Sequence, residues 1–420
     1  MSGFQRSVAG HAGSSATQTQ TQTQPRPKVA RDAHGNVFKV PDYSIKDILS
    51  AIPPECYQRS LAKSLAFVAR DIAAIVGLGL LAHLYVAPQL AESAWFVRFL
   101  FWNVYAAAVG LFSTGLWILA HECGHQAFSD YGAVNDFVGW VLHSYLLVPY
   151  FSWKYSHSKH HKATGHLHRD MVFLPPTKQE FWSYRGWAAN VAEYTEDSPL
   201  RTLGELVLQQ LGGWIGHLFT NVTGQKYPDA PAWKRNHFWP TSPLFDAKDT
   251  LYIALSDLGV LAQCVVLRMW YLKFGGWSLF INWFVPYLWV NHWLVFITFL
   301  QHTDQTLPHY DNSEWSFAKG AAATIDRQLA FVGPHIFHDI IETHVLHHFV
   351  SRIPFYNARP ASEAIKKVMG EHYRSCDENM FKSFWKVARS CQYVDGKDGL
   401  FMFRNVNNVG IGTGAAEESS

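Results

Sequence analysis

The sequence predicts an all-α integral membrane protein with four transmembrane helices in two hairpins. Charged residues are only 16% of the 420 residues, against about 25% in typical soluble chains. Four stretches reach the roughly 20 apolar residues that a bilayer crossing needs, at 66–87, 94–120, 251–272 and 279–301. Eight of the 22 histidines fall into three short groups outside these stretches or at their ends. Together these observations predict interfacial or re-entrant helices and a cytosolic helical cap that holds a histidine-rich metal site.

Composition also excludes several classes of protein. The net charge is +2, so no basic excess is available for nucleic-acid binding, which depends on neutralising phosphates. The cysteines are few and scattered, with no paired spacing typical of a disulfide framework or a zinc ribbon. We therefore expect reduced thiols at Cys56, Cys123, Cys264, Cys376 and Cys391.

Three regions follow one another along the chain. Residues 1–39 are predicted to be a disordered polar tail, because the repeat TQTQTQTQ and its surroundings lack the apolar residues that ordering requires. No short apolar segment of the signal-peptide type follows the start. Residues 40–405 form the predicted membrane domain, which begins with a capped amphipathic helix in PDYSIKDILSAIPPE. Residues 406–420 are predicted to be a flexible C-terminal tail.

Basic residues indicate the orientation of the four spans. The two short connections near 88–93 and 273–278 contain one basic residue, Lys273, while 31 of the 35 lysines and arginines lie in 1–63, 152–250 and 302–420. The positive-inside rule then places both termini and the long loops in the cytosol. Two further apolar stretches, at 131–151 and 204–222, carry polar residues and are predicted to lie in the interface or to re-enter the membrane.

The three histidine groups have the spacing of metal ligands. Residues three and four apart share one face of a helix, so each group directs its imidazoles toward one point. Imidazole suits iron, zinc, copper and nickel, and eight donors are too many for one tetrahedral ion, so two metals with open positions fit better. The candidate ligands are His121, His125, His157, His160, His161, His344, His347 and His348.

The eight histidines can meet only if all three groups lie on one side of the bilayer. Two predicted spans separate the second group from the third, so these two share a side. Only the 131–151 stretch separates the first group from the second. We therefore expect this stretch to dip into the membrane or to lie flat, without crossing. Isolated histidines are more often hydrogen-bonded or interfacial, and this interpretation is applied to His83, His143, His217 and His292.

The histidine groups stand within longer motifs, which are HECGHQAFSDYG, HSKHHKATGHLHRDMVF, NHWLVFITFLQHTD, GAAATIDR and IETHVLHHFVSRIPFYNA. Over nearly all of residues 40–405, these motifs resemble those of the membrane fatty acid desaturases and their hydroxylase relatives. They are most similar to the fungal methyl-end acyl-lipid Δ12 and ω-3 (Δ15) enzymes, and FSDYGAVNDF and GPHIFHDIIETH are nearer the ω-3 type.

The resemblance implies a non-haem di-iron enzyme of the endoplasmic reticulum membrane that desaturates C18 acyl chains esterified in phospholipid. It implies O₂ as co-substrate and electrons from NADH through cytochrome b5 reductase and a separate cytochrome b5. The eight histidines carry over as ligands of two iron ions, and no catalytic residue is expected beyond the ligands. A further ligand is expected at His302 or at His338, although a polar residue at a helix end explains either equally well.

Carboxylates near the histidines are candidates for orienting the ligand imidazoles, as partners of metal-bound histidines commonly do. Each is equally explained as a solvated charge at a helix end. These candidates are Glu122, Asp130, Asp170, Asp339 and Glu342. The Trp, Phe and Tyr side chains of the spans at 94–120 and 279–301 are candidate walls of an apolar acyl channel, although lipid-facing or core packing explains most of them better.

Three alternatives stay open. The first is a fatty acyl hydroxylase, epoxygenase or acetylenase of the same family, which sequence does not separate from a desaturase. The second is an intramembrane zinc protease that uses the H-E-x-x-H pattern of His121, Glu122 and His125. The third is a metal transporter, whose ligands should lie near the middle of the membrane. Regiospecificity, whether Δ12, ω-3 or both, is also left open.

Overall fold

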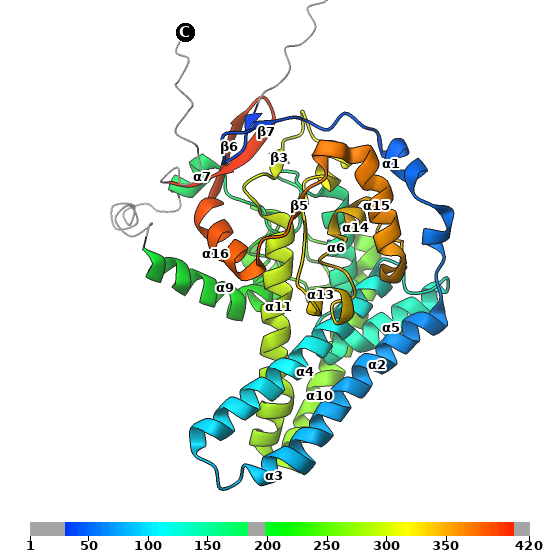
Figure 1. Cartoon of the computed structure of the whole chain (residues 1–420), viewed down its shortest axis with the longest axis vertical. Coiled ribbons are helices and arrows are strands. Elements are labelled where there is room, and N and C mark those ends of the chain that lie inside the picture. Colours follow the sequence, from blue (N-terminus) through cyan, green and yellow to red (C-terminus); the bar gives the residue numbers. More distant parts are fainter. Residues whose placement is uncertain (1–29, 184–197, 407–420) are drawn as a thin grey trace, which may run out of the picture.

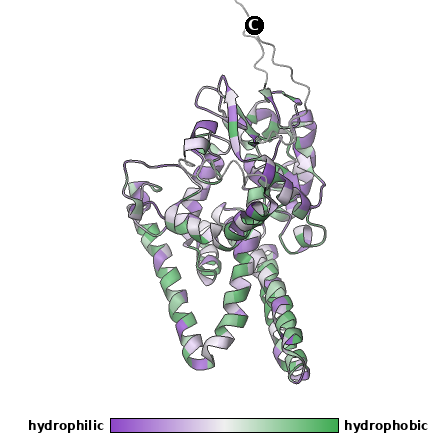
Figure 2. Cartoon of the chain, turned by 90° about the vertical axis from the view of Figure 1, so that its left-hand side faces the viewer, coloured by the Kyte–Doolittle hydropathy of each residue, from purple (hydrophilic) through white to green (hydrophobic). Residues whose placement is uncertain are grey.

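The structure, a computed structural model, describes residues 30–183 and 198–406. Long helices project from a cap of shorter helices and small sheets (Figure 1). Apolar residues predominate on the projecting helices, while the cap carries more of the hydrophilic ones (Figure 2). The described residues thus form an apolar helix bundle and a more hydrophilic cap.

Three segments are long and apolar enough to cross a membrane: Leu61–Gln89, Trp95–Gly124 and Ala247–His302. The first comprises α2 (Leu61–Leu80), a π-helical stretch η2 (Leu81–Val86) and α3 (Ala87–Gln89), and the second is α4 (Trp95–Gly124). The third comprises η5 (Ala247–Asp249), α10 (Thr250–Leu279), η6 (Phe280–Phe284) and α11 (Val285–His302). Three of the four predicted stretches lie within these segments, and the remaining one, 94–120, begins one residue before the second segment.

The third segment is interrupted at Gly275. Its φ of 81° and ψ of 165° are not helical and are favourable only for glycine. Beyond this residue the chain reverses direction, because Trp270 Nε1 donates to Ser278 Oγ at 3.0 Å, whereas eight residues of continuous helix would span about 12 Å. The stretches predicted at 251–272 and 279–301 therefore lie on the two sides of one turn.

Helix α4 is the central helix of the bundle. Of its most apolar 18-residue stretch, 72% is buried within the protein. The corresponding buried share is 11% in the first segment and 17% in the third. It packs against α2, α11 and α5 (Gly132–Tyr145). Gly110 permits close approach to α11, because a Cβ atom there would lie 2.4 Å from the Cβ of Trp289.

The two further apolar stretches form shorter or partly exposed helices. Helix α5 has 14 residues, about 21 Å at the usual rise, which is less than the hydrocarbon thickness of a bilayer. Helix α9 (Pro199–Thr220) lies at the base of the cap and packs against α11 (Figure 1). Its outer face exposes large apolar side chains at Leu200, Leu203, Leu208, Leu211 and Phe219.

The cap lies around those ends of the long helices that are predicted to face the cytosol. Its helices are α1 (Ile45–Ala51), α6 (Tyr150–Ala163), α7 (Lys178–Ser183), α12 (Phe317–Ala321), α13 (Val332–His335), α14 (His344–Phe349), α15 (Ala358–Met369) and α16 (Met380–Ser390). Short 3-10 turns lie at η1 (Pro54–Tyr57), η4 (Ala232–Lys234), η7 (Phe355–Asn357) and η8 (Gly370–His372). Helix α1 has the predicted cap, a reciprocal capping box between Ser44 and Asp47.

The chain is mostly helical, as predicted, but the cap also contains short strands that the prediction did not include. Strands β3 (Pro308–Tyr310), β7 (Leu400–Arg404) and β6 (Tyr393–Lys397) form an antiparallel sheet in that order, and β4 (Asp326–Arg327) pairs with β5 (Ser375–Cys376). Asp398 and Gly399 connect β6 to β7 with positive φ at both residues, 57° and 83°. Asp-Gly between two apolar runs is a strong hairpin signal, so this sheet was detectable from the sequence.

The ordered domain also begins earlier than predicted. Strands β1 (Ala30–Arg31) and β2 (Val37–Phe38) pair within the expected N-terminal tail. Arg404 donates to the carbonyl of Arg31 at 2.7 Å, and the amide of Ala33 donates to the carbonyl of Gln305 at 3.2 Å. Backbone pairing with the cap orders this polar segment in spite of its composition. The remainder of the predicted tails, 1–29 and 407–420, lies outside the described residues.

Candidate metal centre

Four helix segments bring nine imidazoles together at the base of the cap. The last turn of α4 carries His121 and its C-cap residue is His125. Helix α6 carries the second histidine group, α14 carries the third, and His302 is the last residue of α11. Helical spacing of three and four residues places the members of each group on one side, as the sequence predicts.

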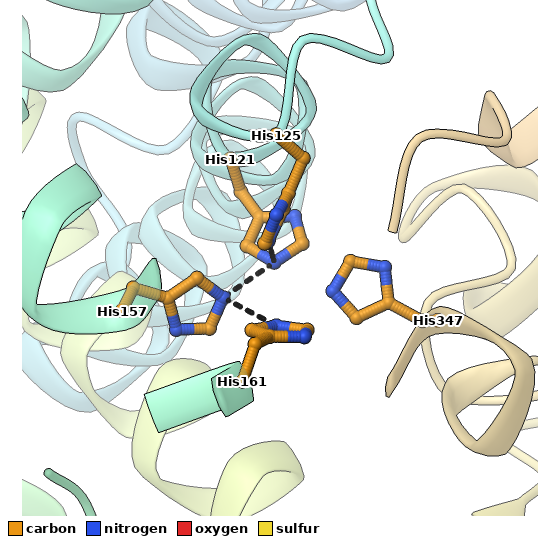
Figure 3. A group of neighbouring side chains, drawn as sticks. All are labelled: His121, His125, His157, His161 and His347. Atoms are coloured by element: carbon orange, nitrogen blue, oxygen red, sulfur yellow. Dashed lines mark hydrogen bonds between the residues drawn. The ribbon is translucent and has the colours of Figure 1, made fainter. Parts of the chain in front are cut away.

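The first cluster draws histidines from α4, α6 and α14. Its ligand atoms all lie within 4.8 Å of one another (Figure 3). The Nε2 atom of His121 is 3.1 Å from that of His157 and 3.2 Å from that of His125, and the Nε2 atoms of His161 and His157 are 3.1 Å apart. The members are His121, His125, His157, His161 and His347.

The second cluster contains His160, His302 and His348, whose ligand atoms also lie within 4.8 Å of one another. His344 adjoins it, with its Nε2 atom 3.0 Å from that of His302. The second and third histidine groups are therefore each divided between the clusters. The rings of His161 and His348 stack at a centroid distance of 4.2 Å and connect the two.

The histidines fit two transition-metal ions. Two nitrogens at about 2.1 Å from one ion, with tetrahedral or octahedral angles, are about 3.0–3.4 Å apart, which matches the spacing of the facing Nε2 atoms. The Nε2 atoms of His347 and His348 are buried without a hydrogen-bond partner among the described residues. Such unpaired polar atoms are costly, and ions at the two clusters would satisfy them.

Burial also keeps these imidazoles in the form that binds metals. Desolvation lowers the pKa of His157, His161, His347 and His348 well below the usual 6.5, and the neighbouring imidazoles lower it further. The neutral ring is therefore the stable form at physiological pH. Metal binding needs no prior loss of a proton from a charged imidazolium.

Two contacts orient imidazoles of the second cluster. Asp170 Oδ1 lies 2.6 Å from His160 Nδ1, and the carboxylate accepts the amide protons of Gly165 and Val172. Thr164 Oγ1 lies 3.1 Å from His348 Nδ1. Occupying Nδ1 in this way fixes the ring and leaves Nε2 free for a metal. Asp170 was predicted in this role; Thr164 was missed, although it follows His160 by one helical turn.

The other candidate carboxylates have mostly different partners. Glu122 Oε1 comes within 3.5 Å of His121 Nδ1 without a hydrogen bond between them, and Oε2 accepts the amide of Phe355. Asp130 pairs with Arg59 at 3.3 Å. Asp339 forms an ion pair with Arg359, and Glu342 accepts the amide of Leu329. Asp130, Asp339 and Glu342 are thus close to a histidine group in the sequence, but each has a partner other than an imidazole.

The structure separates the two candidates for a ninth position. His302 lies in the second cluster. His338 instead directs Nε2 toward Asp71 Oδ2, at 3.0 Å. The isolated histidines lie outside both clusters: His83 contacts Asn282, His143 contacts the carbonyl of Trp117, His217 contacts Thr223, and His292 packs among aromatic rings.

A largely apolar cavity opens on both clusters. Its walls come from α4, α6, α9 and α11, and it reaches His121, His157, His160, His302 and His344. The expectation that aromatic residues of the second and fourth spans form the walls holds only for Trp117. Helix α11 contributes Leu294, Val295, Ile297 and Thr298, and the other aromatic walls are Trp153, Phe173 and Trp214. Sequence reasoning missed α9 as a wall, because only tertiary docking brings it there.

Comparison with known proteins agrees with this geometry. A family model described as fatty acid desaturase matches residues 99–379. An oleate hydroxylase of Claviceps purpurea is 48% identical, over 90% of this chain and 84% of its own length. Δ12 fatty acid desaturases of Mortierella alpina and Arabidopsis thaliana are 40% and 39% identical, over 89% and 87% of this chain and 94% and 92% of their own lengths. The chain therefore belongs to the fatty acid desaturase family.

Proposed function

We propose that this chain is an acyl-lipid desaturase that inserts a cis double bond toward the methyl end of C18 chains in phospholipid. Its products would be linoleoyl chains from oleoyl (Δ12), α-linolenoyl chains from linoleoyl (ω-3), or both. The observation that carries this proposal is the pair of histidine clusters at the wall of one apolar cavity. The names of the Δ12 relatives support it.

Nine imidazoles would hold two iron ions, five at the first cluster and four at the second. When bound, the iron ions activate O₂ for removal of hydrogens from an unactivated methylene pair, a step that protein side chains alone do not perform. Asp170 and Thr164 hold the rings of His160 and His348 in position. No acid–base pair of side chains is required.

The cavity supplies the positional selectivity. Adjacent methylenes of an alkyl chain are chemically alike, so the bond that reacts is decided by which carbons lie beside the metal ligands. Trp153 stacks on His157 with ring centroids 4.5 Å apart, and both line the cavity. This rigid wall excludes water and confines the chain next to the first cluster.

We further propose four membrane crossings, with the third and fourth joined at Gly275. The distribution of basic residues supports a cytosolic location for both termini, the cap and the clusters. Helices α5 and α9 would lie in the cytosolic interface, which keeps all three histidine groups on one side. A relative named as an endoplasmic reticulum enzyme supports that membrane as the location. Electrons would come from NADH through cytochrome b5 reductase and a separate cytochrome b5, as the family resemblance implies.

Hydroxylation is the second candidate function, and the 48% identity to an oleate hydroxylase favours it. Both reactions begin with removal of one hydrogen from the acyl chain. They differ in how the resulting carbon radical is converted into product. Product analysis separates them directly.

The test is expression in a yeast that makes only monounsaturated chains, with and without added linoleate, followed by gas chromatography and mass spectrometry of the fatty acids. Linoleate alone indicates Δ12 activity, linolenate from added linoleate indicates ω-3 activity, and hydroxylated chains indicate the hydroxylase. The variant His347→Ala should abolish every product, while His335→Ala, an exposed histidine outside both clusters, should retain them. An unchanged fatty-acid profile from well-expressed protein would overturn the proposal.

A further inference from the structure

Helix α9 carries two consecutive glycines where it forms a wall of the cavity. Gly212 and Gly213 lie in the interior of this 22-residue helix, where glycine is among the least favourable residues. Gly213 lines the cavity. A Cβ atom on Gly212 would have nothing within 4 Å. The two neighbours thus face different surroundings, although the cost of glycine to the helix is the same for both.

Close packing between helices does not explain Gly213. A Cβ atom there would lie 3.5 and 3.6 Å from the two γ carbons of Val295 on α11, and 3.7 Å from Cγ of Gln209. These are ordinary van der Waals distances, so alanine would fit between α9 and α11. Gly110 of α4 is the contrasting case, because its added Cβ would collide with Trp289 at 2.4 Å. A side chain longer than alanine at position 213 would extend into the cavity.

The neighbouring residue on α11, Val295, indicates how far Gly213 lies from the metal ligands along the cavity. Val295 precedes His302 by about two helical turns, or about 10 Å at the usual rise. The surrounding wall is mostly apolar: Leu294 adjoins Val295, and the rings of Trp117 and Trp214 lie 6.0 Å apart, with Gln209 as a polar neighbour of Gly213. Such a wall suits a hydrocarbon end that has no polar group to satisfy.

We propose that the missing side chain at Gly213 sets the space available to the methyl end of the acyl chain, and thereby selects chain length. The inference rests on the proposed function, because it assumes that the cavity holds the acyl substrate. A larger residue at 213 would shorten the usable cavity. It would therefore penalise an 18-carbon chain more than a 16-carbon chain whose reacting carbons lie at the same place.

The experiment compares Gly213→Leu with Gly212→Leu in a yeast that contains both 16- and 18-carbon monounsaturated chains. The measured quantity is the ratio of 16-carbon to 18-carbon diunsaturated product, each relative to its precursor, which does not depend on the amount of enzyme. We expect Gly213→Leu to raise this ratio roughly 10-fold, the size of a one-methylene misfit in an apolar pocket. Gly212→Leu should leave the ratio at the wild-type value.

Two further variants test the space itself. Val295→Phe fills the same region from the opposite wall and should raise the ratio even if Gly213→Leu fails to accumulate. Val295→Ala in the Gly213→Leu background should return the ratio toward wild type, which a merely structural role for Gly213 would not produce. Iron content of the purified variants, measured by plasma mass spectrometry, should be equal.

The outcomes separate the two hypotheses. If wild-type protein desaturates both chains, but Gly213→Leu and Val295→Phe keep the wild-type ratio, the chain-length inference is overturned and the proposed function stands. If the wild type yields no new double bond in either monounsaturated chain or in added linoleate, the proposed function is overturned and this inference with it.

Discussion

His338 Nε2 lies 3.0 Å from Asp71 Oδ2, and both side chains are buried. The contact joins α2 to the segment that precedes α14, because His338 stands six residues before His344 in the third histidine group. Asp71 also accepts from the guanidinium of its neighbour Arg70 at 2.6 Å. The charged pair in the first predicted span thus anchors the segment that leads into α14, the helix carrying the third histidine group.

This contact leads to opposite expectations for two histidine variants. His302→Ala removes an imidazole of the second cluster, so the iron content should fall from two ions per chain to about one. His338→Ala leaves both clusters intact and should keep two. Plasma mass spectrometry of protein purified from iron-supplemented cells measures both. Equal loss of iron from the two variants would contradict the assignment.

The pair should also contribute to stability. Asp71→Ala leaves the buried His338 without this hydrogen-bond partner, and an unsatisfied buried polar group costs about 1–3 kcal/mol. In a double-mutant cycle with His338→Ala, the second substitution should cost much less in the Asp71→Ala background than alone. Thermal unfolding in detergent micelles gives the four values. Simple additivity would show that the contact carries no coupling energy.

Asp170 is expected to act through His160. Asp170→Asn weakens the 2.6 Å contact with His160 Nδ1, and loss of such an orienting partner typically reduces metal affinity or activity 10- to 100-fold. The matched control is Asp339→Asn, because Asp339 is paired with Arg359 and should affect neither. Competition with a chelator during iron loading reports the affinity without depending on turnover. The expectation fails if Asp170→Asn and Asp339→Asn release iron at the same chelator concentration.

Stability should fall in acid because of buried neutral histidines. Burial lowers the pKa of His237 from 6.5 to about 4. Between these values the unfolded chain binds more protons at this residue than the folded chain does. The free energy of unfolding therefore falls as the pH decreases from 6.5 toward 4, by up to about 1.4 kcal/mol per pH unit for one group.

Replacing His237 removes this contribution. His237→Asn should flatten the pH dependence of the free energy of unfolding by about that slope. The measurement is unfolding in detergent between about pH 4.5 and 6.5, at equal ionic strength and equal metal content, because only then do the slopes compare proton binding alone. The exposed His335→Asn is the control and should leave the slope as in wild type. Parallel curves for wild type and His237→Asn would refute the prediction.

Membrane topology can be tested by labelling single cysteines in a cysteine-free background. Tyr131, before α5, and Lys162, near the end of α6, are both exposed, and cysteines at these two positions should react with impermeant reagents only from the cytosolic side. A cysteine at Lys273, beside the turn at Gly275, should react only from the opposite side. Labelling of positions 131 and 162 from opposite sides would mean that α5 crosses the membrane.

Features that depend on local pattern could be predicted from the amino-acid sequence. Long apolar runs predicted the bundle, because a bilayer-length helix needs no long-range information. Histidines three and four residues apart predicted shared faces, because α-helical periodicity alone places them there. The cap at the start of α1 could likewise be predicted. The Asp398-Gly399 hairpin also has a local sequence signal, although no strand was predicted there.

Features that depend on contacts between distant segments were set by the tertiary structure alone. In the sequence the histidines form three groups, but folding divides the second and third groups between two clusters. His160 and His161, for example, lie in different clusters. Folding also selected His302 for the second cluster and paired His338 with Asp71, 267 residues away. The cavity wall on α9 has the same origin. Such choices follow from how helices dock, and docking is set by the packing of many side chains at once, which no local pattern encodes.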